Sequence, residues 1–446
     1  MPDDSHAELA RRAGEVLERN RRGDWTCPSR DFYPHQWLWD SCFVAIGLAR
    51  HDPQRAAQEV RALFRGQWAN GMLPHMIFAD GARDAGSRRI WRSKTHPDAP
   101  RDVETSCITQ PPLVSVTVGR VAENLSAADR NAFLEELFPK LVAYHEWLYR
   151  ERDPRQRGLV TLLHPWECGL DTTPPWMRAL RRMAQPWWLR LALRWRLARG
   201  ARLFRRDTRY LPSGERASDN DGLRMLVLIQ RAKRHGFALE RMPPGESVLI
   251  EDLAFNAFLA FANRSLGEIA DTIGQSLHPG LLDRCHATEV ALEELWDETS
   301  GQYYSRDAQT DRLIKLPTIA TFLPLLAGVP SDERAQRLIA LLREPSGFWP
   351  RYPVPSVATD APAFDADRYW KGPTWVNTNW AIIAGLRACG EDELARELRY
   401  RTLELVARAG FSEYFSPLTG EGYGADDFSW TAALALDLVE GESPAP

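Results

Sequence analysis

The stretch DFYPHQWLWDS at residues 31–41 combines the two signals that decide the fold. Aromatic, amide and carboxylate side chains crowd around a proline, and an apolar segment with helical periodicity follows directly at 37–51. Loops of this composition stand beside predicted helices at five more places along the chain. We therefore expect a helical fold in which such loops meet at one end.

Helical periodicity dominates the remaining sequence, and strand signals are confined to 159–163 and 302–304. Ser126, Ser331 and Asp52 stand where helix N-caps are expected. About thirteen helices joined by short loops favour an all-α (α/α)6 barrel, which needs about twelve. The predicted helices lie near 5–21, 37–51, 54–69, 104–123, 127–151, 218–236, 249–276, 287–297, 317–328, 331–343, 375–389, 391–409 and 427–440.

Composition narrows the classes of function. The net charge of -4 argues against a nucleic-acid partner, because such proteins usually carry a basic excess. Six scattered cysteines without a CxxC pair predict neither a zinc site nor a disulfide scaffold, and they fit a reducing compartment. The sequence shows no apolar signal region and no run of roughly 18 apolar residues, so we expect a cytoplasmic protein that does not span a membrane.

We expect one catalytic domain over residues 1–446, with a helical, cap-like insertion at 176–221. Its first part, 176–206, contains ten arginines and no acidic residue, with Trp187, Trp188 and Trp195 among the arginines. A membrane-surface helix or a nucleic-acid patch would explain this composition. An insertion beside the barrel, with its arginines paired or solvated, is the interpretation we favour. The polar run SGERASDND at 213–221 resembles a mobile loop.

Six loops share an unusual composition: Trp, Tyr, Gln, Asn, Asp and Glu accompany Gly and Pro. Aromatic faces stack on sugar rings, and amides and carboxylates bind vicinal hydroxyls, so the loops together indicate a carbohydrate pocket. The 17 tryptophans of the chain suit this interpretation, although they could also fill a core. The loops are DFYPHQWLWDS at 31–41, QWANGMLPHMIF at 67–78, ETSCITQPPL at 104–113, HPWECGLDTTPPW at 164–176, RYWKGPTWVNTNW at 368–380 and FSEYFSPLTGEGYGADDFSW at 411–430.

Two of these loops carry candidates for the acid and the base of glycoside hydrolysis. Asp171 stands near Trp166 and Trp176, a setting that raises the pKa of a proton donor, and Glu167 is its local competitor. Glu167 could instead bind a sugar hydroxyl or hold the loop. For the base, the residues alone leave Glu413 and Glu421 open.

The chain resembles glycoside hydrolase family 63 in the sequences of its loop motifs and in their order, and within that family it is most similar to the bacterial mannosylglycerate and glucosylglycerate hydrolases. The motifs are YPHQWLWDS, LPHMIF, TQPPL, HPWECGLD, YWKGPTWVNTNW and FSEYF. The resemblance covers residues 33–434. It implies an (α/α)6 barrel and an inverting mechanism without metal or cofactor, with Asp171 as general acid and Glu413 as general base. It also implies that the sugar site includes Tyr33, Trp37, Trp39, Asp40, Gln110, Tyr369, Trp370, Trp375 and Trp430.

Features beyond the motifs leave the substrate open. The family often has Ser where this chain has Cys168, and the Arg-rich insertion directly follows the acid loop. A glycerate aglycone would need a cation, for which Lys371, Arg88 and Arg89 are candidates. Loops 79–103 and 207–221 are candidates to close over the substrate.

Other activities also fit the sequence. A trehalase-like or other α-glucosidase is the main alternative. A sugar epimerase or isomerase using paired histidines is less favoured, since His35, His75 and His164 give it only weak support. We expect a small sugar as the partner, and a homo-oligomer is compatible with the sequence.

Overall fold

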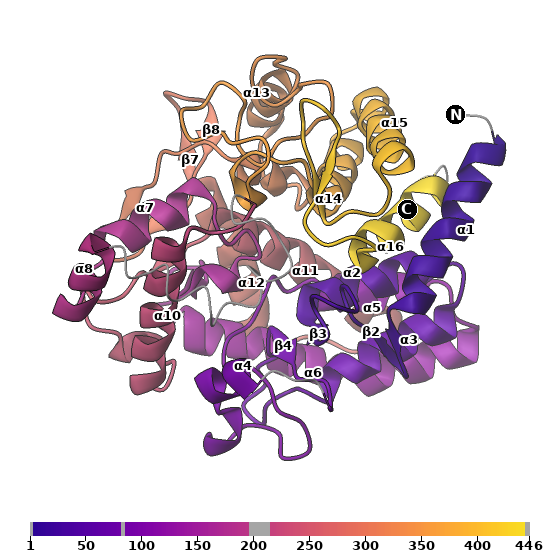
Figure 1. Cartoon of the computed structure of the whole chain (residues 1–446). Coiled ribbons are helices and arrows are strands. Elements are labelled where there is room, and N and C mark those ends of the chain that lie inside the picture. The colour runs from indigo at the N-terminus through magenta and orange to yellow at the C-terminus, as the bar shows by residue number, and fades with distance from the viewer. Residues whose placement is uncertain (1–2, 82–84, 196–214, 442–446) are drawn as a thin grey trace.

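The computed structural model describes residues 3–81, 85–195 and 215–441, and its elements are drawn in Figure 1. Its strands are all two residues long, so helices carry the architecture. The helices are α1 (Asp3–Arg19), α2 (Leu38–Leu48), α3 (Pro53–Phe64), α4 (Ala85–Trp91), α5 (Val114–Ala122), α6 (Ala127–Arg152), α7 (Pro174–Arg182), α8 (Trp187–Arg194), α10 (Asp219–Arg234), α11 (Leu253–Thr272), α12 (Pro279–Glu293), α13 (Asp332–Leu342), α14 (Val376–Ala388), α15 (Asp392–Ala409) and α16 (Ser429–Glu440).

Short 3₁₀ helices and strands complete the described chain. The 3₁₀ helices are Ser93–Thr95, Pro165–Glu167, Leu239–Arg241, Ile319–Leu325 and Tyr369–Lys371. The strands are β1 (Arg21–Arg22), β2 (Trp25–Thr26), β3 (Gln36–Trp37), β4 (Met76–Ile77), β5 (Thr161–Leu162), β6 (Ile250–Glu251), β7 (Trp296–Asp297), β8 (Gln302–Tyr303), β9 (Arg306–Asp307), β10 (Arg312–Leu313), β11 (Tyr414–Phe415) and β12 (Gly422–Tyr423).

The inner helices form a closed ring. Helix α2 packs against α5, α5 against α11, α11 against the 3₁₀ helix Ile319–Leu325, that helix against α14, α14 against α16, and α16 back against α2. A second layer surrounds this ring: α1, α3, α6, α12, α13 and α15 each contact one or two inner members. Inner and outer segments alternate along the chain, so the predicted (α/α)6 barrel is confirmed.

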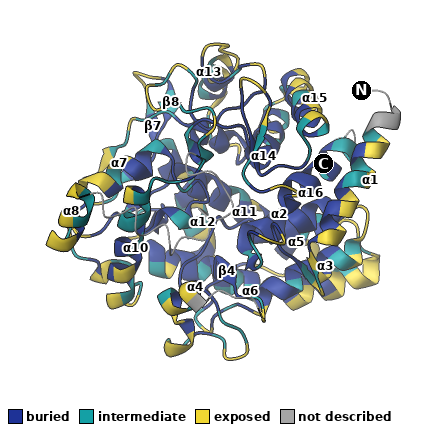
Figure 2. Ribbon diagram, in the orientation of Figure 1, coloured by how far each residue is buried: buried dark blue, intermediate teal, exposed yellow. Residues whose placement is uncertain are grey.

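Composition explains which helices lie inside. Every residue of α2 is buried, as are nine of the twelve residues of α16. A helix that is apolar on all sides is stable only when protein surrounds it. The outer helices α3 and α13 instead alternate buried and exposed faces, and Figure 2 shows exposed residues on their outer sides.

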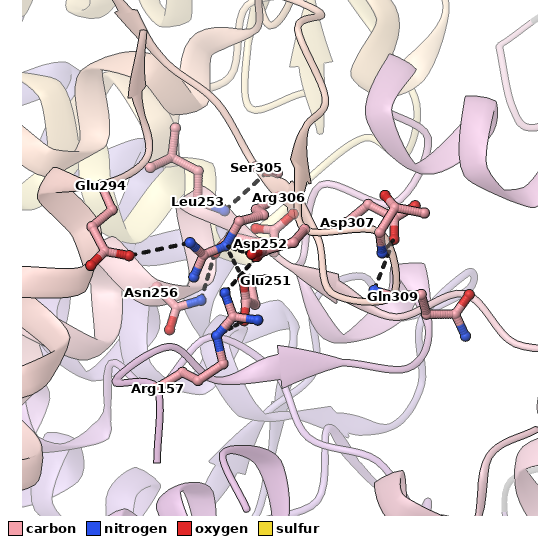
Figure 3. A network of polar contacts seen from close by, with 12 residues as sticks. Arg157, Glu251, Asp252, Leu253, Asn256, Glu294, Ser305, Arg306, Asp307 and Gln309 are labelled. Atoms are coloured by element: carbon pink, nitrogen blue, oxygen red, sulfur yellow. Dashed lines mark hydrogen bonds and ion pairs between the residues drawn. The ribbon is translucent and has the colours of Figure 1, made fainter. Parts of the chain in front are cut away.

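The loop that carries Asp171 rests on a small antiparallel sheet ordered β10-β9-β6-β5. Arg306 at its centre pairs with Glu251 and, at 3.2 Å, with Glu294 (Figure 3). Asp252 caps α11 by accepting a hydrogen bond from the Phe255 N–H, and it also accepts one from Trp176 Nε1 at 2.9 Å. The sheet and the cap therefore fix both ends of the acid-bearing loop.

Three predicted helices differ from the structure. Residues 104–113 are not helical, because Pro111 and Pro112 prevent helical hydrogen bonding there, and helix α5 begins at Val114. Helix α12 starts eight residues before the predicted 287, at Pro279, after the His278 cap. The stretch 317–328 forms a 3₁₀ helix with Pro324 inside it.

The proposed insertion at 176–221 contributes α7, α8 and the start of α10 between α6 and α11. Residues 196–214 of this insertion lie outside the described residues. The two loops predicted to close over the substrate, 79–103 and 207–221, are therefore described only in part, because 82–84 and 207–214 are also outside.

The contact between α2 and α16 gives a test of the ring. A β-carbon added at Gly47 would lie 2.1 Å from the Ala433 carbonyl oxygen, so Gly47→Ala must push the two helices apart. We expect the free energy of unfolding to fall by about 1–3 kcal/mol in chemical denaturation. Gly119→Ala is the matched control: its β-carbon meets nothing within 4 Å, so stability should rise by roughly 0.5–1 kcal/mol. Equal stability of the two variants would contradict the described packing.

Candidate active site

The six aromatic loops contact one another in sequence around one end of the barrel. Strand β3 of the first loop pairs with β4 of the second, and Ile77 bridges to Thr105 of the third. The backbone N–H of Trp370 donates to Thr172 Oγ1 at 3.3 Å, which joins the fourth loop to the fifth. Thr374 bridges to Phe415, joining the fifth to the sixth. The loops predicted to share a pocket are therefore brought together.

Glu413 lies at the centre of this cluster with an exposed fraction of 1%. Tyr33 Oη donates to its Oε1 at 3.2 Å, and the Ala425 N–H donates to its Oε2 at 3.0 Å. Arg216 binds both oxygens, with Nη1 3.2 Å from Oε1 and Nη2 on Oε2. This bidentate geometry fixes the plane of the carboxylate.

Aromatic rings surround Arg216. Its guanidinium carbon lies 4.4 Å from the ring centre of Tyr369, 5.1 Å from that of Phe32 and 5.7 Å from that of Tyr33. Cation–π attraction of this kind offsets part of the cost of burying a charge. The neighbouring Glu215 accepts a hydrogen bond from the Gly424 N–H at 3.1 Å, so the segment is attached beside the loop of Glu413.

Asp171 has the environment of a proton donor. Burial disfavours its charged form and raises the pKa to about 8; Arg216 opposes this shift and the charge of Glu413 adds to it. The carboxyl group of Asp171 is therefore largely protonated at neutral pH. Because the charge of Glu413 contributes to this shift, the two predicted catalytic groups lie near each other.

Asp40 is a third carboxyl group, and it interacts electrostatically with Glu413 and Asp171. Burial raises its pKa well above the usual range, and the negative charges of Glu413 and Asp171 raise it further. A carboxyl group presents two oxygens for hydrogen bonds, which suits vicinal sugar hydroxyls.

The predicted aromatic residues form one continuous cluster. Trp370 and Trp375 stack with ring centres 3.7 Å apart, and Trp375 in turn contacts Tyr369 and Trp430. Trp39 contacts Trp370 and Trp430, while its backbone N–H donates to Gln110 Oε1 at 3.4 Å. The indole N–H groups of three members find no acceptor among the described residues: Trp37, Trp370 and Trp430.

Two glycines allow the catalytic loops to come close to their neighbours. Gly169, at φ 74°, lies where a β-carbon would come within 2.6 Å of the Trp39 ring. Gly424, at φ 77°, lies where a β-carbon would come within 2.5 Å of Glu413 Oε2. Both need a left-handed backbone and the absence of a side chain.

The local competitors of the two catalytic candidates have other surroundings. Glu167 is fully buried, pairs with Arg152 at 2.8 Å and accepts a hydrogen bond from the Leu163 N–H, which are the contacts of a group that holds the loop. Glu421 is exposed and accepts a hydrogen bond from Tyr423 Oη at 3.1 Å.

The predicted aglycone cations do not join the cluster around Glu413. Arg88 pairs with Glu104 and lies 4.8 Å from the ring centre of Phe78. Arg89 is exposed. Lys371 is half-buried, and burial lowers its pKa, whereas the negative charge of Asp221 raises it.

The histidines are not arranged as paired bases. Burial lowers the pKa of both His75 and His164 to about 3, so both are neutral. His75 Nδ1 bonds Ser106 Oγ, and His164 bonds the Met225 carbonyl and the Trp166 N–H. His35 accepts a hydrogen bond from the Ala79 N–H at 3.2 Å. All three stabilise loops. In the described ranges, no group of three or more His, Cys, Asp or Glu side chains is placed to hold a metal ion.

Sequence reasoning missed Arg216. The residue belongs to the run SGERASDND, whose composition indicates a mobile loop. Arg216 contacts Glu413, which is 197 residues away in sequence, and no local sequence pattern indicates that contact.

A carboxyl group with a raised pKa lies near a second carboxyl group that Arg216 binds, beside an aromatic cluster on a helical barrel. This arrangement defines the class: a glycoside hydrolase. Comparisons with known proteins agree. The model of the mannosylglycerate hydrolase MGH1-like glycoside hydrolase domain matches residues 33–431. The chain is 40% identical to a mannosylglycerate hydrolase of Thermus thermophilus, over 95% of the chain and 99% of the relative. It is 34% identical to a glucosylglycerate hydrolase of Mycolicibacterium hassiacum, over 98% and 100%.

A solved structure agrees as well. A family 63 mannosylglycerate hydrolase of Thermus thermophilus, crystallised with Tris and D-glycerate, superposes with a TM-score of 0.85 at 38% identity, over 96% of this chain and 99% of that one. The chain belongs to the mannosylglycerate hydrolase MGH1-like family of glycoside hydrolases, and it is a glycosidase. The resemblance seen in the sequence is confirmed.

Gly424 gives a test of the geometry around Glu413. In Gly424→Ala the new methyl group would displace Glu413 Oε2, so we expect kcat to fall at least tenfold, the effect of about 1.4 kcal/mol on the barrier. Gly390→Ala is the control, since its φ of 76° imposes the same backbone strain with nothing within 4 Å. Both variants should lose about 1–2 kcal/mol of stability in denaturation. An equal kcat for the two would show that the approach to Glu413 does not matter.

Proposed function

We propose that this glycosidase hydrolyses an α-linked hexosyl glycerate, mannosylglycerate or glucosylglycerate, with inversion of configuration. Asp171 donates a proton to the glycosidic oxygen, and Glu413 takes a proton from the attacking water. The observation that carries the proposal is the contrast between the surroundings of these two groups: burial raises the pKa of Asp171 to about 8, whereas Glu413 forms an ion pair with Arg216. An acid–base pair requires two carboxyl groups whose environments differ in this way.

The leaving group needs a proton as the glycosidic bond breaks. An acid with a pKa near the working pH combines a large protonated fraction with easy transfer. The pKa of Asp171 at about 8 meets this condition, and burial is its main cause.

Arg216 is the proposed partner of the glycerate carboxylate. It is a buried cation beside the base, and its Nε has no acceptor among the described residues. When a substrate carboxylate arrives, Arg216 can exchange part of its contact with Glu413 for the new anion. One oxygen of Glu413 then becomes available to the attacking water. The substrate would in this way prepare the base.

The sugar ring is assigned to the aromatic cluster. The N–H groups of Trp37, Trp370 and Trp430 are buried donors without acceptors among the described residues, a state that costs about 1–3 kcal/mol each unless a ligand hydroxyl binds them. Asp40 and Gln110 lie in the same group of loops and suit further hydroxyls.

A cytoplasmic location is also proposed. All six cysteines are free thiols, which fits a reducing compartment.

The assignment of acid and base is tested by replacing each carboxyl group. Asp171→Asn and Glu413→Gln should each lower kcat by roughly 10²–10⁴-fold while substrate binding persists, because only proton transfer is removed. The exposed Glu421→Gln serves as the control and should keep full activity. Proton NMR of the wild-type reaction should show the β-anomer of the free sugar first. Full turnover in either catalytic variant, or initial release of the α-anomer, would overturn the mechanism.

The pH dependence of kcat/KM is a second test of the assignment of Asp171 as the acid. Asp171 acts only while protonated, so kcat/KM of the wild type should fall as the pH rises through about 8.

The role of Arg216 is tested with two aglycones. Arg216→Ala removes a charged hydrogen bond to the aglycone carboxylate, worth about 1.5–3 kcal/mol, so kcat/KM for the hexosyl glycerate should fall roughly 10–150-fold. The loss should be smaller for the corresponding hexosyl glycerol, which has no carboxylate. Arg88→Ala, which breaks the pair with Glu104, is the control and should treat both substrates alike. If Arg216→Ala lowers kcat/KM equally for both substrates, Arg216 binds only Glu413 and does not bind the aglycone carboxylate.

A further inference from the structure

Helix α8 exposes large apolar side chains. The exposed fractions are 71% for Trp187, 43% for Trp188, 67% for Trp195 and 47% for Leu191. Isolated apolar residues on a surface need no explanation, whereas a contiguous group of aromatic side chains marks an interaction site. Figure 2 shows α8 at the margin of the molecule with its outer side exposed.

The exposed residues follow helical geometry. At 100° per residue, Trp187, Leu191 and Trp188 fall within one sector of about 100°, and Arg190 and Arg194 flank it on one side. Trp195 follows as the C-cap residue of the helix. The opposite side carries the buried Leu189, which anchors the helix to the protein. This apolar sector bordered by cations is the pattern of a helix that lies in a membrane interface.

The arginines of this region are not neutralised by the described chain. Arg178, Arg182, Arg190 and Arg194 are exposed, and none forms an ion pair with a residue the structure describes. Arg181 differs, since it pairs with Asp221 at 3.1 Å. The sequence from 174 to 195 contains no acidic residue. Among the described arginines of 176–195, Arg181 is therefore paired with an acidic neighbour and the other four are exposed to solvent, and the expectation for this insertion included both cases.

A hollow beside α7 gathers further positive charge. Its volume is ≈ 480 Å³, and Arg178, Arg182 and Arg312 line it. The acidic residue in its lining, Asp307, accepts hydrogen bonds from the N–H groups of Gln309 and Thr310 (Figure 3). Three arginines at a concave site of this size suit an anionic headgroup.

We propose that α7 and α8 form a docking surface for an anionic phospholipid bilayer. We name it the Trp–Arg surface; its residues are Arg178, Arg182, Trp187, Trp188, Arg190, Leu191, Arg194 and Trp195. The tryptophans enter the headgroup region, where their apolar rings and polar N–H groups are both accommodated. The arginines pair with lipid phosphates. Binding is peripheral and reversible, and no described helix is long and apolar enough to cross a bilayer.

Charge favours lipid over a second copy of this chain. An isologous contact through the Trp–Arg surface would bring the exposed arginines of both copies together, and like charges at an interface oppose association. An anionic bilayer instead offers a phosphate to every arginine. The proposal is independent of the substrate, because no residue of this surface belongs to the cluster around Asp171 and Glu413.

Co-sedimentation with vesicles tests the proposal. The full-length enzyme should sediment with vesicles of phosphatidylcholine mixed with phosphatidylglycerol and remain in solution with phosphatidylcholine alone. Arg190→Gln combined with Arg194→Gln should lower the partition coefficient about 30-fold at low ionic strength, since each arginine near an anionic surface is worth about 1 kcal/mol. Trp187→Ala combined with Trp195→Ala should remove binding. Raising the salt from about 0.1 M to about 1 M should weaken wild-type binding, because it shortens the Debye length.

Matched controls come from the outer helix α15. Tyr400 is 48% exposed and Arg396 is also exposed, so Tyr400→Ala combined with Arg396→Gln removes similar groups elsewhere and should leave binding unchanged. Hydrolysis in solution should be equal in all variants, which shows that they fold. Three results would each overturn the proposal: no binding to anionic vesicles, binding that persists in both double variants, or a dimer in sedimentation velocity that the tryptophan variant dissociates without any vesicle binding.

Discussion

The site depends on the burial of three carboxyl groups that lie near one another. Asp40, Asp171 and Glu413 interact electrostatically, and in a medium of low dielectric three negative charges so placed could not coexist. The three carboxyl groups therefore differ in their electrostatic environments. Arg216 binds Glu413, while burial raises the pKa values of Asp171 and Asp40. The electrostatic difference between Glu413 and the other two groups thus follows from the position of one positive charge.

The barrel makes this arrangement possible. A closed ring of buried helices leaves little room for its ends to move, so loops more than 300 residues apart in sequence, such as those of Tyr33 and Glu413, stay in hydrogen-bonding distance. The small sheet of β10-β9-β6-β5 then supports the acid loop, and Asp252 holds Trp176 just beyond it. Where the backbone itself must approach a side chain closely, a glycine supplies the space, as Gly169 and Gly424 do.

Much of this architecture could be predicted because it depends on local signals. The caps Ser126 and Ser331 mark true helix starts, and the six loops were recognisable because their composition differs from that of ordinary connections. Helix α12 was predicted too short because its apolar residues follow no clear face. Asp171 and Glu413 could be named from motifs, but the choice over Glu167 and Glu421 needed the family resemblance. Arg216 could not be found, because only the folded chain brings an arginine from a polar run against Glu413.

The raised pKa values also couple the site to the folding equilibrium through proton uptake. In an unfolded chain Asp171 would ionise near the ordinary value of 3.8, whereas in the folded protein it does so at about 8. Between these two values the folded state binds more protons than the unfolded state, so folding takes up protons at neutral pH and unfolding releases them. The contribution of Asp171 therefore favours the folded state most below its unfolded pKa and declines as the pH rises toward 8. The environment that raises the pKa of Asp171 thus makes the fold somewhat less stable in alkaline solution.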